Sequence, residues 1–334
     1  MAPVTDSILL SAFDERWQNF RVQHKACRME FSNEAVHDLR VSARRMLAIL
    51  GAARALAPHP RVRKARRELK DLIDDMDELR DAQVMLVEIS ETLEALPELK
   101  PFQKFLTKRE AKLMRAAYKR IKQKGLSDLG KRIKKIRESL EEAEQKDAQF
   151  NERMLEAVNN AYSLAGQAYG QVDALQVASI HHLRLAFKKF RYLVEMAHPL
   201  IKDFPIENFK SMHEYQGMMG NIQDAEVFLA SFSEYVEKHS PKSRAENINL
   251  FYESKLKSLV AEFLENKGEL FTFWDFDKLR NEETKNESVH HTSRNRSGSR
   301  KSKIRGGQPA AADGEGEGQN EENSAGLMGT GSAI

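Results

Sequence analysis

One short motif occurs twice in this chain of 334 residues, and its repetition limits the folds that the chain can adopt. The segment 34–46, EAVHDLRVSARRM, aligns with 178–190, ASIHHLRLAFKKF, so that His, Leu, Arg and a basic doublet share positions. Downstream, LRDAQV at 79–84 resembles IQDAEV at 222–227. The first motif recurs after 144 residues and the second after 143. Two motifs at nearly one separation predict the duplication of a unit of roughly 140 residues.

The chain reads as a series of helices. No proline occurs from Phe102 to His198, a span that is hard to reconcile with a turn-rich β fold. Apolar residues recur three and four positions apart and do not alternate, so no strand is predicted and the fold class is all-α. A break or a close helix approach is expected at 216–220, which contains two glycines. Gly125 and Gly130 are expected to bracket a break, and we expect helices over about 5–30, 33–57, 61–81, 102–124, 131–145, 151–168, 177–197, 206–217, 222–238 and 241–264.

Composition and repetition divide the chain into three parts. We predict a first repeat over 1–145, a second over 146–280 and a disordered tail over 281–334. The tail contains almost no apolar residues, so it cannot bury enough surface to offset its chain entropy. The longest uncharged run, 157–172, is interrupted by Asn, Gln and Gly and is no membrane span. A lone Cys27 excludes a disulfide framework and a Cys-rich zinc site, and a cytoplasmic location is expected.

Each copy of the first motif separates an apolar stripe from a basic face when it is placed on a helix at 100° per residue. The basic faces comprise His37, Arg40, Arg44 and Arg45 in the first copy, and His181, Arg184, Lys188, Lys189 and Tyr192 in the second. A solvated helix surface normally mixes acids with bases, because opposite charges three or four residues apart stabilise it. Few acids accompany these residues, so a polyanion is expected to relieve the repulsion.

Charge is segregated along the chain, although the net charge is only +3. From His37 to Lys70 there are ten Lys or Arg and two Asp or Glu, and from Pro101 to Arg137 there are fourteen against two. Neutrality comes from acidic runs elsewhere, such as 71–78 and 141–144. Basic segments of this kind predict binding of an anionic polymer.

With these motifs the chain resembles the CHAD family, the conserved histidine α-helical domain, over about residues 5–275. The family motif reads His-x-x-Arg-x-x-x-Arg-Arg, followed downstream by Leu-Arg-Asp-x-x-Val, in two copies. The second copy departs from it, with lysines at 188 and 189 and Gln223 in place of an arginine. The resemblance implies two pseudo-symmetric helical bundles whose basic helices face a shared groove or pore. It also implies binding of inorganic polyphosphate without catalysis.

The charge pattern and the resemblance together give the candidate binding residues. They are His37, Arg40, Arg44, Arg45, Arg63, Arg66, Lys70, Arg80, Lys112, Arg115, His181, Arg184, Lys188, Lys189, Arg191, Tyr192, Lys210 and His213. Charge reversal of Arg40 and Arg44 is expected to weaken binding without unfolding the protein. We expect no catalytic residue, no metal and no cofactor, and the oligomeric state stays open.

Two alternatives to polyphosphate binding remain at this point. Binding of nucleic acid through the same groove and the basic tail is the first, although stacking aromatics are absent apart from Tyr192. A phosphohydrolase with His37 or His181 as the acid is the second, and it lacks a nucleophile or a metal-binding carboxylate cluster. The side chains of His37 and His181 are expected either to contact the ligand or to form a hydrogen bond with a backbone carbonyl oxygen. Asp81 and Asp224 are expected to cap a helix or hold an arginine. Association with polyphosphate granules is a further expectation.

Overall fold

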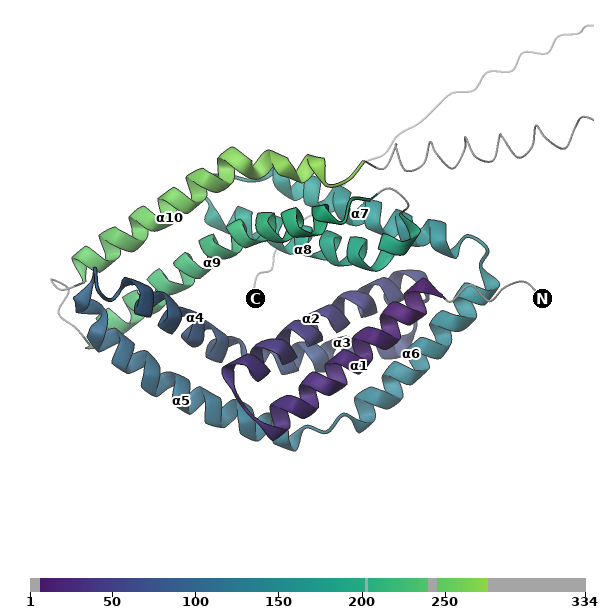
Figure 1. Ribbon diagram of the computed structural model, residues 1–334, viewed down its shortest axis with the longest axis horizontal. Coiled ribbons are helices and arrows are strands. Elements are labelled where there is room, and N and C mark those ends of the chain that lie inside the picture. Colours follow the sequence, from purple (N-terminus) through teal and green to yellow (C-terminus); the bar gives the residue numbers. More distant parts are fainter. Residues whose placement is uncertain (1–6, 202–203, 240–244, 276–334) are drawn as a thin grey trace, which may run out of the picture. The chain divides into compact units, whose positions relative to one another are not determined.

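Helices supply the regular structure of the chain in the computed structural model, which describes residues 7–201, 204–239 and 245–275 (Figure 1). The helices are α1 (Ile8–Met29), α2 (Asn33–Leu56), α3 (Pro60–Asp74), α4 (Asp77–Thr92), α5 (Lys100–Gln123), α6 (Ser127–Lys146), α7 (Phe150–Gly170), α8 (Val177–Ala197), α9 (Glu207–His239) and α10 (Glu246–Asn266), with 3-10 turns η1 (Pro97–Leu99), η2 (His198–Leu200) and η4 (Lys267–Thr272). Extended pairing within these ranges is limited to an isolated bridge between Asp173 and Gln176. The prediction of an all-α fold is confirmed.

The first two helices begin at serine caps. The Oγ atoms of Ser7 and Ser32 each accept a hydrogen bond of 3.1 Å from a backbone N–H three residues later. Such a cap satisfies one of the donors that a helix leaves unpaired at its N-terminus. Helix α2 begins at Asn33, as expected, and α1 begins at Ile8, three residues after the expected start near residue 5.

Three predicted helix boundaries are wrong. Helix α6 begins at Ser127, inside the break expected between Gly125 and Gly130. The third helix was expected to continue to about Asp81, but α3 ends at Asp74 and α4 begins at Asp77, which makes a corner. The break expected at 216–220 is absent, because α9 runs continuously for 33 residues. Glycines inside a helix cost about 1 kcal/mol each relative to alanine. Here the buried side chains of Met219 and Ile222 continue one packed face across them.

Two hydrophobic cores lie within the described residues. The larger is built mainly by α1, α2, α3, α6, α7 and α8, with the first half of α9. The smaller is built by α4, α5, α10 and the second half of α9. In the smaller core the rings of Phe228 and Tyr252 stack with centroids 3.7 Å apart, and Phe102 meets Phe232 at 5.2 Å. Helix α9 therefore contributes to both cores.

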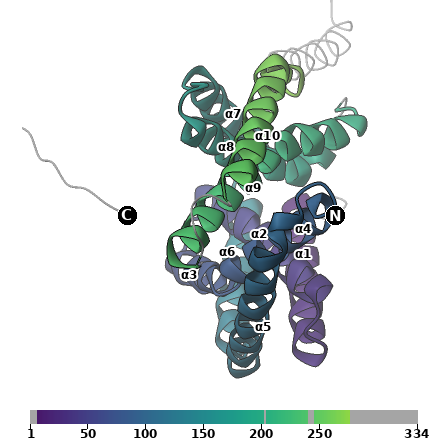
Figure 2. The same ribbon diagram turned by 90° about the vertical axis from the view of Figure 1, so that its left-hand side faces the viewer.

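The two basic motifs are carried by helices that pack against each other. Helix α2 packs on α1 and α3, and α8 packs on α7 and α9. Helices α1 and α2 also contact α8, and Figures 1 and 2 show α1–α6 on one side of this contact and α7–α10 on the other. The basic faces of α2 and α8 can therefore meet.

The order of the elements agrees with the predicted duplication. A shift of 144 residues brings the bounds of α1, α2 and α5 to within three residues of those of α7, α8 and α10. The predicted boundary at 145/146 falls where α6 ends and α7 begins, and residues 1–283 form one compact unit. The duplication and this boundary stay predictions, and the predicted tail, 281–334, lies outside the described residues.

Candidate functional site

Arg40 on α2 is a structural residue. Its side chain is 5% exposed, and its Nη2 atom lies 2.6 Å from Oδ1 of Asp77. Its Nη1 atom donates to the carbonyl oxygen of Ile73 at 3.1 Å, in the last turn of α3. The expectation that Arg40 lies on an accessible basic face is therefore wrong. The sequence pattern placed it at the edge of that face, where the corner between α3 and α4 covers it.

Arg44 lies one turn further along α2 and is accessible. Its side chain is 37% exposed, and its Nη2 atom is 3.9 Å from the carboxylate of Asp77 that Arg40 also contacts. Burial lowers the pKa of Arg44 most, and the charges of Arg40 and Arg184 lower it further, while Asp77 and Tyr192 raise it. Because Arg184 and Tyr192 belong to α8, Arg44 faces the second basic helix.

Lys188 on α8 is the most strongly perturbed cation of the site. Burial first, and then the charges of Arg44, Arg184, Arg191 and Arg40, lower its pKa to about 7. Two of these arginines come from α2 and two from α8. Cations from both motifs therefore meet at one place, which we call the central cationic cluster: Arg40, Arg44, Arg184, Lys188 and Arg191.

Tyr192 packs within the central cationic cluster. The Nζ atom of Lys188 lies 5.9 Å from the centroid of its ring, and Cζ of Arg191 lies 5.1 Å from it. Arg191 also forms an ion pair of 3.5 Å with Glu195 and lies 3.3 Å from Nδ1 of His213. The ring is thus a cation–π partner for side chains of its own helix.

Several buried polar atoms of α8 have no hydrogen-bond partner in the part of the chain that the structure describes. The buried atoms Nδ1 of His181, Nε of Arg184 and Nε of Arg191 make no hydrogen bond among the described residues. Buried polar groups are nearly always satisfied, so unpaired donors in a group call for a ligand or water as acceptor. All three lie on the helix that supplies most of the central cationic cluster.

Arg184 packs against a glycine of α9. A Cβ atom placed on Gly220 would lie 3.7 Å from Nη2 of Arg184. This is an ordinary van der Waals distance, so the position would accept a Cβ atom, and nothing lies within 4 Å of a Cβ atom placed on Gly217. The close helix approach expected as the alternative at 216–220 therefore stays a prediction.

The second motif places two carboxylates beside the central cationic cluster. Desolvation raises the pKa of Asp81 most, although its side chain keeps substantial exposure; Asp77 and Asp224 raise it further, and Arg40 and Arg44 lower it. Desolvation also raises the pKa of Asp224, which Arg184 and Arg80 lower. The carboxylate that holds Arg40 is Asp77, which sequence reasoning missed because it lies outside the repeated motif.

Arg80 and Asp224 line a cavity of about 340 Å³ between α4, α9 and α10. A polar network crosses its wall, where Glu88 accepts from Nζ of Lys255 at 2.6 Å and from the hydroxyl of Tyr252 at 3.2 Å. The remaining wall is largely apolar. Arg80 therefore lies in the cavity wall together with Asp224, whose pKa desolvation raises and both Arg184 and Arg80 lower.

The two motif histidines have different surroundings. His37 is exposed on the second turn of α2. His181 is half-buried, and its pKa is lowered first by burial and then by Arg184, against a hydrogen bond with Gln223. No group of three His, Cys, Asp or Glu side chains that could hold a metal ion occurs in the described ranges.

The other candidate binding residues are not members of the central cationic cluster, and their surroundings differ. Exposed side chains with no ion pair among the described residues are found at Arg45, Arg63, Lys70, Lys112, Arg115 and Lys189. Arg66 donates to the carbonyl oxygen of Leu47 at 2.8 Å, which is a structural contact between α3 and α2. Lys210 forms an exposed ion pair of 3.6 Å with Glu214.

Arg16 of α1 was missed from the sequence. Burial lowers its pKa most, Glu15 and Glu195 raise it, and Arg45 lowers it. Glu195 belongs to α8 and Arg45 to α2, so Arg16 lies where α1 meets these helices. It stands outside both repeated motifs, and no spacing in the sequence distinguishes it.

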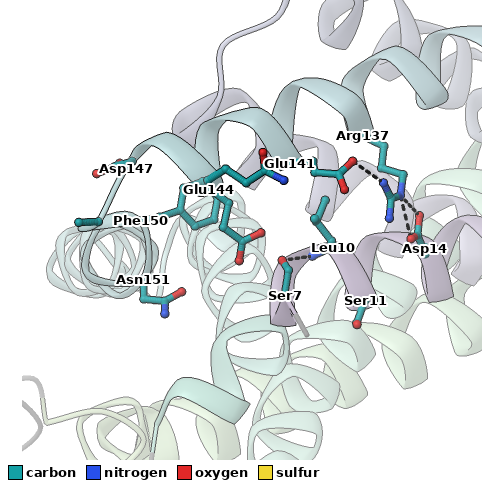
Figure 3. Close-up of a pocket in the computed structure, with 12 residues that line it drawn as sticks. Ser7, Leu10, Ser11, Asp14, Arg137, Glu141, Glu144, Asp147, Phe150 and Asn151 are labelled. Carbon is teal, nitrogen blue, oxygen red and sulfur yellow. Dashed lines mark hydrogen bonds and ion pairs between the residues drawn. The ribbon is translucent and has the colours of Figure 1, made fainter. Parts of the chain in front are cut away.

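A second and larger cavity has the opposite charge. It measures about 520 Å³ and is lined by residues of α1, α6 and α7, among them Glu141, Glu144 and Asp147 (Figure 3). Its one cation, Arg137, is held by Asp14, whose two carboxylate oxygens each lie 2.9 Å from Nε. An acidic wall repels a polyanion, so this cavity is not the site that the basic motifs predict.

Comparisons with known proteins agree with the motifs. A model of the CHAD domain matches residues 11–243. A solved structure, the crystal structure of the CHAD domain from the plant Ricinus communis, is similar with a TM-score of 0.60 and 18% sequence identity, over 80% of this chain and 89% of that chain. Curated proteins gave no match. In the described ranges no helix is long and apolar enough to cross a membrane.

Proposed function

The chain belongs to the CHAD domain family, and on this premise we propose that it binds inorganic polyphosphate through the central cationic cluster. The observation that supports this most is the meeting of α2 and α8, where Arg44 of one motif faces Arg184 and Lys188 of the other. Like charges held this close destabilise the free protein, and a chain of phosphates relieves their repulsion.

The unpaired donors of α8 support the same proposal. Phosphate oxygens are strong acceptors, and guanidinium groups bind them by charge-assisted hydrogen bonds. The buried Nε atoms of Arg184 and Arg191 supply donors that nothing in the described protein occupies. Lysine at 188 neutralises charge as a point cation and lacks the fork of arginine.

We propose that binding involves no chemical step. The carboxylates closest to the cluster, Asp77, Asp81 and Asp224, are engaged electrostatically with arginines. Their roles are to hold cations in position, and the site offers no activated nucleophile. Association with polyphosphate granules follows from this binding as a proposal about location.

Competition binding tests the proposal. Polyphosphate of about 100 units, single-stranded RNA and duplex DNA should compete for the protein at matched salt, and polyphosphate should win because Tyr192 is the one aromatic of the site and is already packed. A variant with Arg44→Gln and Lys188→Gln should lose about tenfold or more in affinity for polyphosphate. The exposed pair Arg63→Gln and Lys70→Gln gives a matched change of charge. Preference for RNA, or equal loss in both variants, would reject the central cationic cluster as a polyphosphate site.

A further inference from the structure

A row of cations runs along the outer face of α5. Its six members are all exposed: Lys104, Lys108, Lys112, Arg115, Lys119 and Lys122. Successive members are three or four residues apart, so at 100° per residue they fall within an arc of about 80°. The row spans about 27 Å at 1.5 Å per residue. We call it the α5 stripe.

The α5 stripe points away from the protein interior. The buried side chains of α5 are Phe102, Leu106, Ala117 and Ile121, which lie on the opposite side of the helix. Figure 1 shows α5 at the outer edge of the group formed by α1–α6, with α4 on its inner side. The stripe is therefore open to a ligand along its whole length.

No ion pair with a described acid neutralises the α5 stripe. None of its six members has an Asp or Glu three or four residues away in the sequence. The acids of neighbouring α4 and its preceding corner pair with other cations of α5, Glu78 with Arg109 at 3.2 Å and Asp75 with Arg120 at 2.7 Å. Like charges three or four residues apart destabilise a helix, and the six cations of the stripe form five successive pairs of this kind.

Some exposed lysines elsewhere in the described chain are paired with an acid. Lys131, Lys135, Lys146 and Lys238 each form an ion pair with an acid on the same helix, at distances from 2.5 to 3.5 Å. The members of the α5 stripe have no ion pair of this kind among the described residues, over about five turns of one helix.

We propose that the α5 stripe is a second polyphosphate-binding surface, separate from the central cationic cluster, which holds the part of a long chain that extends beyond the cluster. This inference rests on the proposed function. A flexible chain of phosphates can follow a straight row of cations, and its second contact is then intramolecular, which strengthens binding without changing either site.

The composition of the stripe favours polyphosphate over two other polyanions. Along α5 no large apolar side chain is exposed, so the helix has none to insert into a lipid surface. Its tyrosine, Tyr118, packs on Phe31 with centroids 5.3 Å apart and lies under Lys122, so it is not free to stack on a base. A chain without bases requires only the cations.

A charge-matched pair of variants tests the inference. The stripe variant replaces Lys104, Lys108, Lys112 and Lys119 by Gln, and the control variant replaces Lys131, Lys135, Lys146 and Lys238 by Gln. For polyphosphate of about 100 units, the stripe variant should bind about tenfold more weakly. The slope of log K against log salt should fall by about three, since each neutralised phosphate of a flexible strand contributes about 0.7. Tripolyphosphate, which is too short to span both sites, should bind both variants and the wild type equally.

The outcomes separate this inference from the proposed function. If the stripe and control variants bind the long chain equally, the α5 stripe is not a polyphosphate surface, whatever the central cationic cluster does. If Arg44→Gln with Lys188→Gln leaves tripolyphosphate binding intact, the proposed function fails independently. Binding of single-stranded RNA or of anionic vesicles that depends on the stripe, without an effect on polyphosphate, would also overturn the inference. Circular dichroism of each variant checks that the helices are intact.

Discussion

The guanidinium of Arg40 and the carboxylate of Asp77 meet at 2.6 Å, at the corner where α3 ends and α4 begins. The same guanidinium bonds the carbonyl oxygen of Ile73. Arg40 therefore ties α2 to both helices of the corner. An arginine that a repeated motif suggests as a ligand contact is thus committed to the fold.

Replacing Arg40 by Ala should destabilise the protein. The change leaves the carbonyl oxygen of Ile73 and the carboxylate of Asp77 without their buried partner, so the free energy of unfolding should fall by about 2 kcal/mol. Urea unfolding followed by circular dichroism measures it. Arg45→Ala, at an exposed position of the same helix, should stay within about 0.5 kcal/mol of the wild type. Equal stability of the two variants would contradict the structural role of Arg40.

The stability of the protein should rise with pH above neutrality because of Lys188. Its pKa is about 7 when folded, against an ordinary value of 10.5. Between these values the unfolded chain binds the proton that the folded protein has lost, so the free energy of unfolding increases with pH across this window. Below pH 7 Lys188 is protonated in both the folded and the unfolded protein, and its repulsion by the neighbouring arginines is fully present in the folded state. Urea unfolding at several pH values should show a weaker rise for Lys188→Met, and an unchanged profile would exclude Lys188 as the cause.

Polyphosphate binding should be accompanied by proton uptake at Lys188. A polyanion beside the ammonium group stabilises its charged form and raises its pKa, so at pH 8 the complex holds a proton that the free protein lacks. Calorimetry in buffers of different ionisation enthalpy measures the number of protons bound. Lys188→Arg stays charged and should bind polyphosphate with less proton uptake. Uptake that is identical in the variant would assign the proton to another group.

Replacing Arg44 by Gln should raise the pKa of Lys188. The positive charge of Arg44 is the largest contribution to the lowered pKa after burial. Its removal relieves repulsion between α2 and α8 without touching α8 itself. The pH dependence of Lys188 acylation, followed by mass spectrometry of the free protein, reports this shift. Arg63→Gln on α3 serves as the control, and a shift of equal size there would show that net charge is responsible and not the contact between the two motifs.

Chelators should change neither the fold nor polyphosphate binding. The described residues contain no cluster that could hold a metal ion, and the cations of the central cluster repel a divalent ion. Thermal unfolding and binding titrations with and without EDTA compare the two conditions. If EDTA abolished both the fold and polyphosphate binding, and zinc restored them, the protein would require a metal site that the basic motifs did not predict.

Much of the fold could be predicted from the sequence because local signals determine it. Helix α8 has the predicted bounds of Val177 and Ala197, and α2 begins at the predicted Asn33. The errors at Asp81 and at 216–220 arise where packing outweighs local preference. Glycines inside α9 are tolerated because buried neighbours on either side keep the helix in one core-facing register.

The candidate site could be predicted only in part. Periodicity identifies the basic faces of α2 and α8, but which cations meet depends on how the two helices pack. Arg40 and Arg44 are one turn apart and look alike on a helical projection, yet one is buried in the corner of α3 and α4 and the other is open. Asp77 and Arg16 carry no sequence signal at all, because their roles come from contacts between helices.

The continuity of α9 has a consequence for how the protein unfolds. At 33 residues the helix is about 50 Å long, and its first half packs in the larger core while its second half packs in the smaller one. Fraying that begins in either core propagates along one uninterrupted hydrogen-bonded ladder into the other. The segment 144 residues earlier in the chain is divided at Asp75 and Met76, so α3 and α4 can open one without the other. Amide hydrogens along α9 should therefore exchange as one cooperative unit, whereas those of α3 and α4 should exchange as two.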